Sequence, residues 1–342
     1  MPTYTWNGGT GSWIDPANWT PSGYPQGSGD TALIASGTVT LQASTINVND
    51  IEIGSDDPSS PAQIVLSDAV LGPDVNLSVT PINPTMPEGG SAVIEVDGTA
   101  TNEGRLYVSN PNNLLDVLIA PGGVFDQEGT ITVSASQNGD ADLLVRGTST
   151  QSSGTTLHNG GTISVTNGGT ATISSDVTGI GVIELATNSP APGVLPTSVE
   201  LGGSVGSGQT IDLSQGLLTL DQPAQFLGTI ENWTSSGLIS LPNVTATSET
   251  YTQTSANGGV LQLYDADHSQ IAALHLAGRY SSDDFVLPQL NGDPYLTVRD
   301  AGNAGLGAST PSSPATVGQL LQDVNRLEAA LTTLIADVRS LL

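Results

Sequence analysis

Short alternations of apolar and polar residues recur along the chain between residues 30 and 300, and Gly, Asn and Asp separate them. With Thr and Ser at the polar positions, a period of two predicts half-buried strands of about four or five residues. No amphipathic segment of helix length interrupts these alternations, and α/β folds, whose parallel sheets need crossover helices, are therefore excluded. The pattern predicts an all-β protein, with strands at 38–41, 46–48, 51–53, 92–96, 105–108, 130–133, 162–165 and 170–173.

Several predicted strands follow a recurring corner sequence. The segments 102–108, 127–133 and 159–165 resemble one another, and 167–170 resembles the start of a further copy. A period near 20 to 30 residues with turn formers before each strand is typical of a β-solenoid, in which stacked coils bury one continuous core. A β-sandwich, which can be built from strands of the same length, is the alternative. Because the spacings drift as solenoid loops do, we expect a parallel β-helix over 31–300.

The two ends differ from this middle. Residues 1–30 contain Trp6, Trp13 and Trp19, three of the four tryptophans, and predict an aromatic cap over the open edge of the solenoid. We expect these three residues to lie at a junction between subunits. Residues 301–316 are rich in Gly, Ser and Pro and predict a flexible linker.

Past the linker, the apolar period changes to alternating steps of three and four. Thr316 is a suitable N-cap, and the segment 317–342 predicts an amphipathic α-helix with coiled-coil heptads. Three roles stay open: association with other chains, a lid folded back onto the solenoid, or a C-terminal export signal. The predicted assembly positions in this segment are Val317, Leu320, Val324, Leu327, Leu331, Leu334, Val338 and Leu341.

Composition excludes several classes of partner. Six basic residues, all of them Arg, stand against 33 acidic ones, and the formal net charge is −27. Such a charge repels phosphate backbones and anionic lipids, so we expect no nucleic-acid binding and no electrostatic membrane docking. Without cysteine the chain has no disulfide, zinc-thiolate site or thiol nucleophile. The sequence contains no run of 18 apolar residues, so it predicts no membrane-spanning helix, and its first six residues do not resemble a Sec-type signal.

Catalytic chemistry is sparse. The histidines His158, His268 and His275 lie in unlike contexts, and we expect each of them in a turn or on the surface. Candidate carboxylate pairs of the glycosidase kind stand at 56–57, 140 with 142, 265 with 267, and 283–284, but adjacent aspartates usually cap turns. Calcium is possible where two aspartates stand two positions apart, although turn formation is the main alternative there. These candidate calcium ligands are Asp140, Asp142, Asp265 and Asp267.

Two terminal stretches carry a family resemblance. The opening Tyr4–Pro21, continued by Pro25 and Gly29–Ala32, resembles the repeat start of bacterial secreted β-helix proteins of the autotransporter-passenger and large-adhesin type. The stretches 261–265 and 271–285 resemble the closing segment of the same proteins. This resemblance implies a right-handed β-helix, an extracellular location and a role in adhesion or matrix building. Two departures are the lack of a following translocator barrel and the lack of calcium-binding glycine-rich nonapeptides.

Two functions follow as hypotheses. The first is a non-catalytic secreted structural protein whose partner is itself, in an extracellular fibre, surface layer or biofilm matrix. The second is a carbohydrate-binding or carbohydrate-active β-helix module that contacts cell-surface glycans, as adhesins and phage spikes do. A row of exposed aromatic residues along one face would favour the second. Outside the N-terminal segment the candidates are few: Tyr107, Trp233, Tyr251 and Tyr264.

Overall fold

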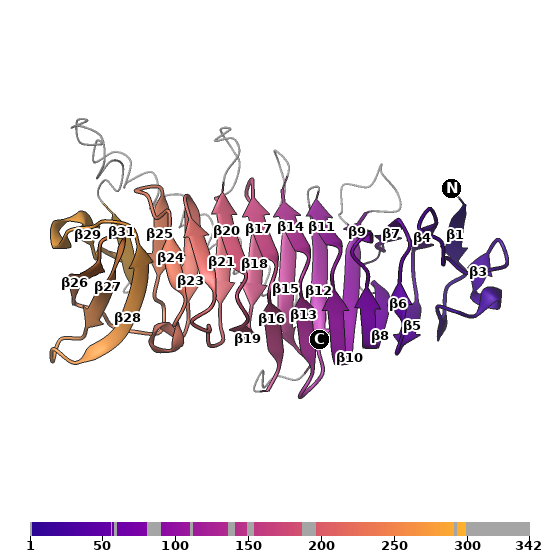
Figure 1. Ribbon diagram of the computed structural model, residues 1–342, viewed down its shortest axis with the longest axis horizontal. Helices are drawn as coiled ribbons and strands as arrows, with labels where there is room; N and C mark the ends of the chain where they lie inside the picture. Colours follow the sequence, from indigo (N-terminus) through magenta and orange to yellow (C-terminus); the bar gives the residue numbers. More distant parts are fainter. Residues whose placement is uncertain are drawn as a thin grey trace.

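The computed structural model of the chain is all-β in the part that it describes, with three short 3-10 helices, η1 (Pro16–Asn18), η2 (Pro223–Gln225) and η3 (Ser282–Asp284). Its strands lie side by side along one long axis (Figure 1). The described residues are 2–55, 57, 60–80, 90–109, 112–135, 141–148, 154–186, 196–290 and 293–298. The predicted linker 301–316 and the predicted helix 317–342 lie outside them.

The first row of strands is a sheet of 14 strands, parallel except at its two ends. Its inner strands are short, and successive members come from successive turns of the chain. In spatial order they are β3 (Trp19–Thr20), β1 (Thr3–Trp6), β4 (Thr31–Ile34), β7 (Asp50–Ile53), β9 (Asn76–Val79), β11 (Arg105–Ser109), β14 (Thr130–Ser134), β17 (Thr162–Thr166), β20 (Val182–Ala186), β22 (Thr210–Leu213), β24 (Thr229–Glu231), β28 (Gln270–Ala277), β27 (Gly258–Tyr264) and β26 (Ser248–Ser255).

The second row follows the first along the chain, and its strands also pair in parallel with the next turn. At its far end an antiparallel strand closes it. The members are β2 (Thr10–Ser12), β5 (Thr38–Gln42), β8 (Ala62–Leu71), β10 (Ser91–Asn102), β12 (Asn113–Ile119), β15 (Ala141–Gly147), β18 (Thr170–Ile173), β21 (Ser198–Leu201), β23 (Gly216–Leu220), β25 (Gly237–Ser240) and β31 (Asp293–Val298), with β29 (Phe285–Val286) and β30 (Gln289–Leu290) paired to β31.

A third, shorter row completes each coil. The long strands β8 and β10 run from the second row into the third, where their last residues pair with β6 (Thr45–Ile46) and β13 (Val124–Gln127). The strands β16 (Thr156–Asn159) and β19 (Asp176–Thr178) then continue this row. One coil, such as β11–β12–β13, thus supplies one strand to each row. Parallel pairing between consecutive coils is the arrangement of a β-solenoid and excludes the antiparallel β-sandwich.

Aliphatic ladders fill the interior. The inward aliphatic positions of β4 to β24 in the first row stack in register from coil to coil and are fully buried. Each fully buried Leu or Ile contributes about 1.5–3 kcal/mol. One ladder reads Ala32, Ile51, Leu77, Leu106, Ile131, Ile163, Ile183, Ile211, Ile230 and Leu276.

The corner repeats found in the sequence are confirmed as equivalent positions of successive coils. Leu106 pairs with Ile131, and Ile131 pairs with Ile163. The corner glycines are needed for space, because a Cβ on Gly129 would lie 2.0 Å from the carbonyl oxygen of Gly104. The expectation that 167–170 starts a further copy of the corner is wrong. Thr170 begins β18 in the second row, so this segment leads into the next row of the same coil and not into a new coil.

Candidate functional site

The three tryptophans of the predicted cap pack against one another inside a single chain. Trp19 lies between Trp6 and Trp13 in edge-to-face contacts, with ring centroids 5.1 and 5.0 Å apart. Its indole N–H donates to the Trp13 carbonyl over 2.7 Å, and that of Trp13 donates to the Pro25 carbonyl over 3.0 Å. All three are at most 4% exposed. These side chains are therefore already covered in the monomer, and any effect on assembly must act through the shape of the cap.

The cap belongs to the first coil rather than forming a separate unit, since β1 pairs with β4 and β2 pairs with β5, in both cases in parallel. Beyond β1, the outermost strand of the first row is β3, which has two residues and runs antiparallel. Such short edge strands offer few free backbone groups to another chain.

The candidate calcium ligands lie in two separate places. Asp142 is buried in β15, and Asp140 lies outside the described residues. Asp265 and Asp267 lie in the exposed turn between β27 and β28, where Asp265 Oδ1 accepts the backbone N–H groups of Asp267 at 3.0 Å and Ser269 at 2.8 Å. Asp265 thus has the turn-forming role that the sequence offered as the alternative, and calcium binding there stays a prediction.

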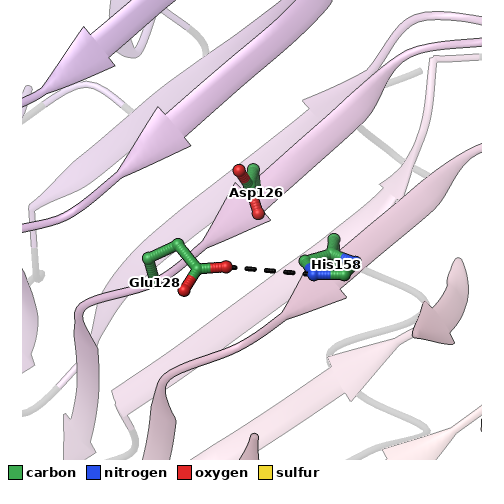
Figure 2. A group of neighbouring side chains, drawn as sticks. All are labelled: Asp126, Glu128 and His158. Atoms are coloured by element: carbon green, nitrogen blue, oxygen red, sulfur yellow. Dashed lines mark ion pairs between the residues drawn. The ribbon is translucent and has the colours of Figure 1, made fainter. Parts of the chain in front are cut away.

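An unanticipated cluster lies on the outer side of the third row. Asp126 in β13, Glu128 just after it and His158 in β16 present ligand atoms that all lie within 4.8 Å of one another (Figure 2). Glu128 Oε1 is 3.8 Å from His158 Nε2, and both side chains are a little under half exposed. Carboxylate oxygens and an imidazole nitrogen together are a metal-binding set.

A column of buried amides holds the members of this cluster in place. Gln127 and Asn159 point inward at the corner between the third and first rows and are fully buried. Because strand residues alternate between faces, the neighbours Asp126 and His158 must point outward. The Gln127 carbonyl accepts the N–H groups of both Gly160 and Gly161 at 2.9 Å, so the corner of one coil is fixed on the corner of the coil before it.

The same amide column continues on both sides of the cluster. Asn102 donates to Gln127 Oε1 over 2.7 Å, and Asn159 donates to Gln209 Oε1 over 2.9 Å. Buried amides that bond along the solenoid axis set the register of neighbouring coils. Between these two pairs, the bonds from Gly160 and Gly161 to the Gln127 backbone carbonyl fix the register, and Asp126 and His158 are direct register partners.

The sequence contained the signal for this cluster. Once the corner segments beginning at Gln127 and Asn159 are superposed, the residues just before them, Asp126 and His158, become stacked neighbours. The expectation that each histidine lies in a turn or on the surface holds for His158, whose side chain is 43% exposed, but it did not anticipate the two carboxylates beside that imidazole. It also holds for His268, which is exposed in a turn with φ of 60°, and for the exposed His275.

A second acidic pair lies on the outer side of the second row. Glu200 in β21 is flanked in register by Thr172 and Thr219. Burial, together with the nearby charge of Asp221, raises the pKa of Glu200 from 4.5 to about 7. Burial also raises the pKa of Asp221. The raised pKa of Glu200 makes stability depend on pH.

Glu200→Gln is expected to stabilise the protein above neutral pH. The folded state keeps a proton that the unfolded chain releases above its pKa of 4.5, so stability falls as pH rises from about 4.5 through about 7. Glutamine removes this loss, and the free energy of unfolding at pH 8 should rise by about 1–2 kcal/mol after allowance for solvent screening. Chemical denaturation at pH 4, 6 and 8 measures it. Parallel stability profiles for the two proteins would contradict the assignment, and Asp221→Asn should produce a smaller change of the same sign.

The outer side of the second row also carries an aliphatic patch, which consists of Val93, Leu114, Leu118 and Leu144. These half-buried residues alternate with inward positions on β10, β12 and β15. Within the patch, Arg146 binds Asp116 in bidentate fashion, with Nε–Oδ1 at 3.1 Å and Nη2–Oδ2 at 2.8 Å. The aliphatic residues of this face are thus interleaved with charged ones, because Asp116 pairs with Val93 and Leu144, and Arg146 pairs with Leu118.

No protein-family model matches the sequence, and no curated protein is significantly similar to it. Across the residues that the structure describes, no helix has the length and apolarity needed to cross a bilayer.

Proposed function

We propose that the protein is a non-catalytic, secreted structural protein of bacteria, built as a right-handed β-solenoid that acts as a rigid rod in an extracellular fibre, surface layer or biofilm matrix. The observation that carries the proposal is the ladder of aliphatic residues that runs in register through successive coils. A core of this kind makes each coil depend on its neighbours and gives an extended, stiff body. The right-handed sense of the coil is proposed because crossover connections between parallel strands are almost always right-handed.

The partner in this proposal is a second copy of the chain. The two copies associate through residues 317–342, which we expect to form an amphipathic helix. The N-terminal end of the rod is a poor joining surface, because its edge strand β3 has two residues. At the other end β26, β27 and β28 form an antiparallel meander, with the eight-residue β26 at the edge of the sheet. Copies that each carry a net charge of −27 also repel one another. A tethered apolar helix overcomes this repulsion by burying its stripe against that of another chain.

The extracellular location rests on composition and on the resemblance of the two ends to autotransporter passengers and large adhesins. A chain without cysteine or lysine, rich in Gly, Thr and Ser and strongly acidic, is typical of exported bacterial proteins. Adhesive contact with a surface is compatible with the same rod.

The carbohydrate hypothesis has less support. It requires a row of exposed aromatic side chains along one face, but Trp233 is 1% and Tyr251 is 7% exposed. Tyr107 projects from β11 between Ser78 and Thr132, so its two register neighbours are small polar residues. These positions do not make a stacking platform for sugars.

Electron microscopy of the purified full-length chain tests the proposal. We expect elongated particles joined into larger assemblies at near-neutral pH and millimolar calcium. A second sample of the same protein without calcium is imaged in parallel, and the comparison shows whether assembly depends on calcium. Monodisperse monomers under every condition would overturn the proposal, and reducing-sugar release or binding on a glycan array would favour the carbohydrate hypothesis instead.

A further inference from the structure

We propose that Asp126, Glu128 and His158 form a binding site for a first-row divalent metal ion of the zinc type, which joins two successive coils of the solenoid. This site is distinct from the proposed assembly function and from the candidate calcium positions. Two of its ligands belong to one coil, at β13, and the third belongs to the next, at β16.

The donor set selects the class of metal. One imidazole nitrogen and two carboxylate oxygens suit zinc and its first-row neighbours, whereas calcium takes six to eight oxygen ligands. Around a tetrahedral ion with bonds of about 2.1 Å, ligand atoms lie about 3.4 Å apart. The distance of 3.8 Å between Glu128 Oε1 and His158 Nε2 is close to that value, so small side-chain rotations suffice. The partial exposure of both side chains leaves room for water as a fourth ligand.

Asp126 supplies an independent indication of a cation. Its Oδ1 atom is buried and has no hydrogen-bond partner, while Thr101 Oγ1 lies 3.5 Å from its other oxygen. A buried carboxylate oxygen without a donor is costly unless a cation or a proton satisfies it. The strongly negative charge of the chain also raises the local concentration of cations.

The imidazole is already oriented for this role. His158 Nδ1 lies 3.2 Å from the hydroxyl oxygen of Thr178 on β19, the next strand of the third row. When Nδ1–H donates to that hydroxyl, Nε2 keeps its lone pair and faces Glu128. Histidines that bind metals usually have their second ring nitrogen held in this way.

Gly160 makes room for the Glu128 carboxylate. A Cβ at this position would lie 2.4 Å from Glu128 Oε1 and 2.6 Å from Oε2, and its three nearest neighbours all belong to the Glu128 carboxylate. An alanine here would therefore displace that carboxylate, which is the far end of a flexible side chain. Gly160→Ala tests the site without removing any ligand.

The experiment measures the protection of each histidine by zinc. The full-length chain is treated with diethyl pyrocarbonate with and without Zn²⁺, and mass spectrometry gives the modification of each of the three histidines. We expect Zn²⁺ to slow the modification of His158 at least tenfold, with little change at the exposed His268 and His275. Glu128→Gln and Gly160→Ala should each reduce this protection at least fivefold, and equal concentrations of Ca²⁺ should give none.

Calorimetry of the same proteins provides the second readout. One Zn²⁺ should bind per chain at this site, and His158→Gln should weaken that binding at least tenfold, whereas the control His268→Gln should leave it unchanged. Equal protection of all three histidines, or protection that survives both Glu128→Gln and Gly160→Ala, would overturn the proposal. Failure of the protein to form filaments would leave this result unaffected, so the two proposals fail separately.

Discussion

Replacing Leu327 and Leu334 together by aspartate is expected to abolish higher assembly while the β circular dichroism of the solenoid survives. Both residues are d positions in the middle of the predicted heptads, where fraying of helix ends matters least. Burial of each should contribute about 1.5–3 kcal/mol, and a charge placed in an apolar seam adds a desolvation penalty. Sedimentation velocity gives the assembly state, and circular dichroism gives the state of the fold.

The matched control adds the same two charges outside the seam. Ala329→Asp with Thr332→Asp alters heptad positions that face away from a and d, so its assembly should resemble that of the wild type. If the Leu327→Asp, Leu334→Asp protein assembles normally, the helix is an export tag or a passenger. If its β signal collapses instead, the segment is a lid of its own chain.

Much of the fold was predictable because its cause is local and repeated. Alternation of Thr with Ile or Val within four or five residues specifies a strand and its buried face, and repetition of the corner residues specifies how the strands stack. The sequence did not reveal that the coil has three rows. Strands β8 and β10 continue from one row into the next across a single bend, at the positive-φ residues Asp68 and Gly98, which do not interrupt the apolar alternation enough to mark a new row. The eight-residue step from Gly161 to Gly169 lies within one coil.

The sites were harder to predict because they depend on stacking across loops of variable length. Asp126 and His158 are 32 residues apart, but they become neighbours because the amides after them share one corner. Burial raises the pKa of Glu200, and so does the nearby charge of Asp221, and composition encodes neither. The cap was predicted from its tryptophans, but their packing inside one chain was not, since an indole can cover its own coil or that of another subunit equally well.

Trp19→Ala is expected to open the N-terminal end of the solenoid without disturbing the middle. Removal of this indole, which is 2% exposed, leaves a cavity between Trp6 and Trp13 and frees the Trp13 carbonyl. Substitutions of this kind cost about 3–5 kcal/mol.

Because coils contact only their neighbours, that loss should be confined to the first coils. Hydrogen exchange should therefore quicken by about 100-fold or more in β1, β2 and β4, and remain unchanged in β17 and β20. Ile14→Ala is the control, since Ile14 is 56% exposed, and its exchange should match that of the wild type. Exchange that quickens equally along the whole rod would mean that the solenoid unfolds as one cooperative unit, and unchanged exchange in β1 would mean that the indole cluster does not hold the cap.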